Sequence, residues 1–115
     1  MDIKLYSANC TGVETNCRYP HETVVADEAS LLSAVARDYV CVAYKDNYRS
    51  KDNFLSTTCL GMDCDNDHSD DPDDWITPAH IRSQFPDVTF AVHYSRHNMI
   101  NKKKKTPRPK FHVLF

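Results

Sequence analysis

Two segments of opposite charge, each attached to a strand-like pattern, constrain this chain more than any other feature. The acidic segment, residues 60–67, closes an apolar run that predicts a strand over 54–62. The basic segment, residues 102–110, leads into a strand pattern over 110–115. Because strand side chains alternate between faces, these strands decide which charged groups share a face. We therefore expect a sheet that carries both segments.

The remaining patterns alternate between strands and helices along one domain, residues 1–115. A helix is predicted from Asp27, with acidic residues in its first turn, and another from the N-cap Thr77, with proline at its first position, to Pro86. Further strands are predicted over 2–6, 39–44 and 88–94, with polar loops between them. The expected fold class is α+β, a mixed sheet with packed helices.

Glycine and cysteine usage narrow the class of protein. Only Gly12 and Gly61 occur among 115 residues, which argues against glycine-rich phosphate loops and dinucleotide-binding fingerprints. The five cysteines form no CxxC pair, and three of them lie in apolar runs. With no signal peptide and no membrane-length apolar stretch, we expect a reduced, cytoplasmic protein that makes no use of a membrane.

Asp63 and Asp65 are the candidate metal ligands. They lie two apart at the end of the predicted strand 54–62, so both carboxylates should point to one face. Adjacent carboxylates favour a hard cation between them, and Mg²⁺ or Mn²⁺ is the expected cofactor. A calcium loop starting at Asp63 is an alternative, but His68 replaces its required glycine and a strand precedes it.

His112 is the candidate histidine of the basic segment. Alternation places Phe111, Val113 and Phe115 on one face, and His112 beside Lys110 on the other. Cations suited to polyphosphate or nucleic-acid backbone lie upstream, namely Arg96, the lysine run and Arg108. His97 lies in a polar turn from which it could reach a phosphate. A zinc site made by Cys64, His68, His93 and His97 is a weaker alternative, since the close pairing of structural sites is missing.

These motifs resemble a known family. The string Leu-Gly-Met-Asp-Cys-Asp over 60–65 is similar to the first motif of the archaeo-eukaryotic primase superfamily. The strings over 95–98 and 106–115 are similar to its histidine-bearing second motif, most of all in primase–polymerase domains of phages, plasmids and other mobile elements. The resemblance covers roughly residues 60–115. Lys110 departs from it, because the family usually has a small residue there.

The resemblance implies a catalytic core around an RRM-like sheet, with Asp63 and Asp65 as metal ligands and His112 on the phosphates of the incoming nucleotide. Arg96, His97, Arg108 and Lys110 become candidate phosphate or template contacts. Nucleoside triphosphates and a single-stranded DNA template would be the partners, with a possible helicase or other replication module in the parent protein.

The expected function is primer synthesis or extension in the replication of a mobile element. The family also needs a third acidic residue on a later strand, so we expect a fragment, truncated at its C-terminus and weak or inactive alone. Two alternatives stay open: a non-enzymatic nucleic-acid-binding module, and a metal-dependent nuclease using the same carboxylates.

Overall fold

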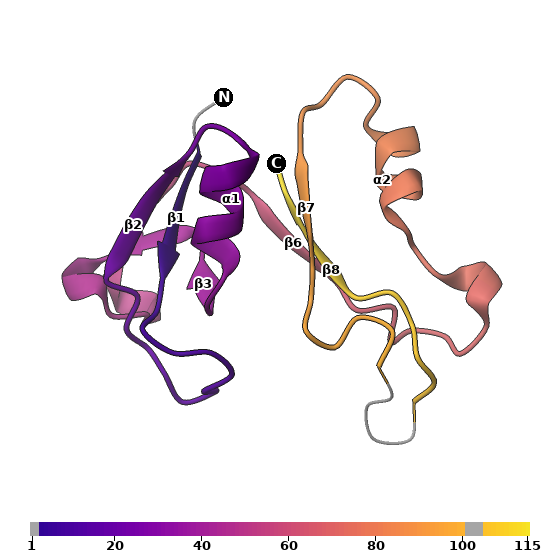
Figure 1. The fold of residues 1–115 in the computed structure, drawn as a ribbon, viewed down its shortest axis with the longest axis horizontal. Helices are drawn as coiled ribbons and strands as arrows, with labels where there is room; N and C mark the ends of the chain where they lie inside the picture. The colour runs from indigo at the N-terminus through magenta and orange to yellow at the C-terminus, as the bar shows by residue number, and fades with distance from the viewer. Residues whose placement is uncertain (1–2, 101–104) are drawn as a thin grey trace. The chain divides into compact units, whose positions relative to one another are not determined.

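The computed structural model describes residues 3–100 and 105–115 and divides the chain into two compact units, Met1–Leu60 and Gly61–Phe115. The described residues form two α-helices and three small antiparallel sheets (Figure 1). The mixed α and β class predicted from the sequence is therefore confirmed. Within the described ranges, neither helix is long and apolar enough to cross a membrane.

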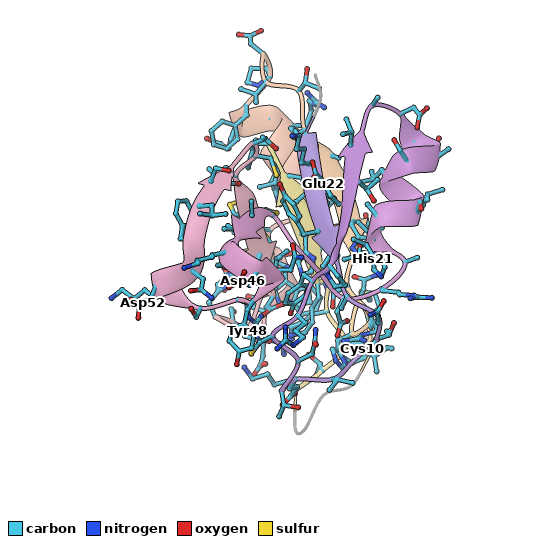
Figure 2. All side chains as sticks on the ribbon, turned by 90° about the vertical axis from the view of Figure 1, so that its left-hand side faces the viewer. Cys10, His21, Glu22, Asp46, Tyr48 and Asp52 are labelled. Atoms are coloured by element: carbon cyan, nitrogen blue, oxygen red, sulfur yellow. The ribbon has the colours of Figure 1, made fainter. Side chains whose placement is uncertain are left out.

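The first unit contains two sheets and helix α1. In one sheet β1 lies between β2 and β3, and in the other β4 pairs with β5. The bounds of these elements are β1 Ile3–Ser7, β2 His21–Val25, α1 Glu28–Val35, β3 Tyr39–Val40, β4 Val42–Tyr44 and β5 Phe54–Thr57. Two short 3-10 helices, Lys45–Asn47 and Lys51–Asn53, join β4 to β5. Figure 2 shows His21 and Glu22 on β2, and Asp46 and Tyr48 in the connection after β4.

Two strand predictions in this unit need correction. The apolar run 39–44 is broken at Cys41 into β3 and β4, which belong to different sheets. The run 54–62 is broken after Thr57, whose hydroxyl lies within hydrogen-bond distance of the carbonyls of both Cys41 and Cys59. The apolar pattern of the sequence does not reveal such a break, because the break depends on which strand each half pairs with. Strand β2 lies where the sequence predicted only a polar loop, between the strand over 2–6 and the helix from Asp27.

The second unit contains one sheet in which β8 lies between β6 and β7, all antiparallel. Its elements are β6 Gly61–Cys64, a 3-10 helix Pro72–Asp74, α2 Pro78–Gln84, β7 Ala91–Tyr94 and β8 Phe111–Leu114. The core contains buried residues from the sheet and α2: Cys64, Ile81, Phe111 and Val113.

Helix α2 forms as the local sequence predicts. The Thr77 hydroxyl accepts from the backbone N–H of His80, and the His80 side chain reaches back to the N-cap backbone. Pro78 takes the first helical position, where its missing N–H costs nothing. Ile81 is the buried residue of the helix, so α2 covers the apolar face of the sheet.

Candidate functional site

The candidate site is a row of three side chains across the sheet of the second unit. Register places His112 of β8 opposite Asp63 of β6 and also opposite His93 of β7. The Nε2 atom of His112 lies 3.5 Å from Oδ1 of Asp63. The centroids of the two imidazole rings are 5.9 Å apart. Strands β6 and β8 thus bring the acidic and basic motifs together.

The opposite face of the same sheet explains why this row is presented outward. Met62 pairs with Val113 and Cys64 with Phe111, and these side chains pack into the core. The intervening residues must then point the other way. The predicted aromatic face of β8 packs into the core, while Lys110 and Leu114, which were predicted on the histidine face, are buried as well. The Asp63 side chain keeps 62% of its surface exposed and that of His112 keeps 35%, so both are open to a ligand.

Asp65 follows the end of β6 and interacts with Asp63. The pKa of Asp63 is raised, mainly by partial burial and then by the negative charge of Asp65, while His112 opposes the shift. A hydrogen bond between the two acidic side chains adds to it. The two carboxyl groups therefore repel each other when both are ionised, and a cation between them relieves that repulsion.

This donor set fits Mg²⁺ or Mn²⁺ as an open site. Magnesium in proteins is usually held by one or two carboxylates, and takes its other ligands from water and substrate phosphates. Asp63 and Asp65 supply that number of carboxylates and are both exposed. Within residues 3–100 and 105–115, His, Cys, Asp and Glu side chains form no group of three placed to hold one metal ion.

His93 also belongs to the row, whereas the sequence predicted it only as one ligand of an alternative zinc site. Its pKa is lowered, first by burial and then by the neighbouring His112, so the neutral imidazole is favoured. The signal that could have found it is strand alternation in β7 combined with the pairing of β7 to β8. That pairing joins residues nineteen positions apart and is not visible in either segment alone.

Lys110, a candidate phosphate contact, lies inside the unit. Its side chain is only 5% exposed, and its Nζ atom donates to Oδ1 of Asp67 at 2.9 Å. Lys105 approaches the same oxygen at 3.6 Å. The hydrogen bond from Lys110 is the main reason that the pKa of Asp67 is lowered. The ammonium of Lys110 is thus neutralised by the acidic segment.

Arg108, another candidate phosphate contact, is fully buried. Its guanidinium donates to the carbonyls of Asn66 and Ser69, each at 2.9 Å, and to the carboxylate of Asp70 at 2.6 Å. It also lies over the ring of Trp75, 5.6 Å from the centroid. As a candidate phosphate contact, Arg108 was expected to face solvent. It instead holds the acidic loop, defined as the connection between β6 and α2 over residues 65–77.

Arg96 and His97 lie in an exposed turn beyond the end of β7. The backbone N–H of His97 donates to the Ser95 hydroxyl, and Asn98 closes the turn onto Ser95. The turn is tied to the basic segment, since Asn98 accepts from the N–H of Lys110. Both candidates therefore belong to the hairpin end, while Asp63 and His112 lie within the sheet. Lysines 102–104 lie outside the described residues.

The alternative metal sites draw no support from this arrangement. Cys64 packs into the core, on the face of the sheet opposite to His93. The segment before the acidic loop is strand β6, whereas an EF-hand calcium-binding loop is preceded by a helix. Comparison with known proteins gave no matching family model, no similar curated protein and no similar solved structure.

Proposed function

We propose that this chain carries part of a metal-dependent nucleotidyl-transfer site of the primase–polymerase type, used in the replication of a phage, plasmid or other mobile element. The observation that supports it most is the pairing of Asp63 with His112 across β6 and β8, with Asp65 beside them. The two motifs that carry the resemblance thus meet in one place. In this proposal the sheet of the second unit forms part of an RRM-like catalytic core.

The residues would divide the work by their chemistry. Asp63 and Asp65 would hold Mg²⁺ or Mn²⁺, which when bound neutralises triphosphate charge and orients the reacting oxygens. His112 is partly exposed beside them and can donate a hydrogen bond to a phosphate oxygen. Asp63 in turn orients the His112 ring through its Nε2 contact. Nucleoside triphosphates and a single-stranded DNA template are the proposed partners.

The environment proposed for this activity is the cytoplasm. All five cysteines are free thiols, in line with a reducing compartment. Because Arg108 and Lys110 are buried in internal contacts, neither a nucleotide site nor the alternative nucleic-acid-binding module would use them as direct phosphate contacts. The nuclease alternative uses the same carboxylates, and the experiment below separates it.

Calorimetric titration with a nucleoside triphosphate, with and without Mn²⁺, tests the proposal. Wild type should bind the nucleotide only with metal, and both Asp63→Ala and His112→Ala should abolish this binding. Asp73→Ala is the control, since Asp73 is an exposed carboxylate of the same unit that lies outside the row, in the 3-10 helix Pro72–Asp74. Binding that survives either site substitution, or that needs no metal, would refute the proposal. Cleavage of DNA with Mn²⁺ in the absence of nucleotide would instead identify a nuclease.

A further inference from the structure

The side chain of Arg108 donates hydrogen bonds to the acidic loop instead of keeping its N–H groups available for a phosphate ligand. Besides the carbonyls of Asn66 and Ser69 and the carboxylate of Asp70, it donates to the backbone carbonyl of Thr106 at 3.1 Å. Its side chain has no exposed surface. A buried guanidinium needs such a full set of acceptors, and here they come from two segments about 40 residues apart.

Asn66 is the point at which these contacts reach the candidate site. It follows Asp65 directly and is 5% exposed. Its side-chain amide donates to the carbonyl of Pro109 at 2.8 Å and to that of Ile76 at 2.9 Å, and its Oδ1 accepts from the N–H of Ile76 at 2.7 Å. Its φ of 56° is left-handed, a conformation that asparagine tolerates better than most residues. The backbone next to Asp65 is thereby held by hydrogen bonds to Ile76, Pro109 and Arg108.

We propose that Arg108 is a positioning residue that, through Asn66, holds Asp65 beside Asp63 for binding of a divalent cation. This inference rests on the proposed function. Asp63 is fixed by the β6–β8 ladder, but Asp65 lies beyond β6 and needs another support. The Arg108–Asn66 contact provides one, because the planar guanidinium can hold several carbonyls at once in a fixed geometry. Arg108 therefore affects the site indirectly, through Asn66, and does not itself contact the substrate.

The matched pair Arg108→Lys and Asp70→Asn tests this role in the full chain. Arg108→Lys keeps the positive charge but loses the planar, forked set of N–H donors. The contacts to both Asn66 and Ser69 cannot then be kept. Asp70→Asn removes the negative charge at the exposed end of the pair but keeps a side-chain oxygen that can accept from the guanidinium, and it leaves the carbonyl contacts to Asn66 and Ser69 in place. Two quantities are measured: backbone order at residues 65–67 by ¹⁵N relaxation, and Mn²⁺ affinity by electron paramagnetic resonance.

Arg108→Lys should lower the order parameters at 65–67 from about 0.85 to below about 0.6, with strand residues unchanged. Its Mn²⁺ affinity should fall roughly 10–100-fold, as for loss of other groups that orient metal ligands. Asp70→Asn should change neither quantity appreciably. Unchanged order and affinity in Arg108→Lys would overturn the inference.

A second variant covers the case in which Arg108→Lys does not fold. Arg108→Gln is neutral, so it leaves no unpaired charge inside the unit, and it cannot keep the contacts to the carbonyls of both Asn66 and Ser69, so it should reproduce both losses. A rigid loop with wild-type Mn²⁺ affinity in Arg108→Gln would overturn the inference. Absence of Mn²⁺ binding in wild type would refute the proposed function, while the order measurement would still decide whether Arg108 holds the loop.

Discussion

Replacing Asp67 by asparagine should destabilise the second unit through Lys110. The Lys110 side chain is 5% exposed, and its ammonium lies 2.9 Å from Asp67. Removing one partner of a fully buried ion pair costs about 3–5 kcal/mol. Asp67 keeps 40% of its side-chain surface exposed, so water screens the pair and can partly solvate the ammonium. We therefore expect a loss of about 1–2 kcal/mol in the free energy of unfolding.

The assay is urea denaturation at pH 7, followed by tryptophan fluorescence. Trp75 is the one tryptophan of the chain and lies in the second unit, so the signal reports the unit that contains the pair. The difference between wild type and variant should also depend on pH. Because Lys110 lowers the pKa of Asp67, the stabilisation is present above the ordinary value of 3.8 and is lost as pH falls through the lowered value.

Two further variants make this prediction refutable. Asp73→Asn, an exposed change in the same loop, should alter the free energy of unfolding by less than about 0.5 kcal/mol. Combining Asp67→Asn with Lys110→Met should recover part of the loss, because no buried charge is then left without a partner. If Asp67→Asn is no more costly than Asp73→Asn, the electrostatic reasoning is wrong.

Three other predictions concern the same unit. Phe111 is fully buried in the core, so Phe111→Ala should cost about 3–5 kcal/mol in urea denaturation and Phe111→Leu clearly less; equal losses would contradict the packing argument. Thr77→Ala removes the cap of α2 and should cost about 1 kcal/mol, whereas Thr77→Ser should be near neutral in the same assay. The lowered pKa of His93 means that its contribution to stability is present above 6.5 and is lost as pH falls through the lower folded value. Proton NMR titration should place the pKa of His93 below 6.5. A higher value would refute the inference that burial and His112 favour its neutral form.

Local sequence signals predicted the elements whose determinants lie within a few residues. Thr77 and Pro78 begin α2 as expected, and its C-cap Phe85 directly precedes Pro86. The alternation of Phe111 and His112 gave the faces of β8 correctly. The apolar run 54–62 was wrongly predicted as one strand. Both β5 and β6 have strand-like sequences, and only their pairing with β4 and β8, respectively, separates them.

The charged residues divide in the same way. The sequence alone indicated that the carboxylates of Asp63 and Asp65 share a face, since a spacing of two on a strand sets the face of each side chain, while the pairing of Asp63 with His112 belongs to the tertiary structure. Only the tertiary structure decided that Arg108 and Lys110 point inward, because burial of a cation depends on acceptors that distant segments supply. Asn66, Ser69 and Asp67 provide those acceptors from about 40 residues away. The alternation of a strand is a local property, whereas the partner of a charge is a property of the whole fold.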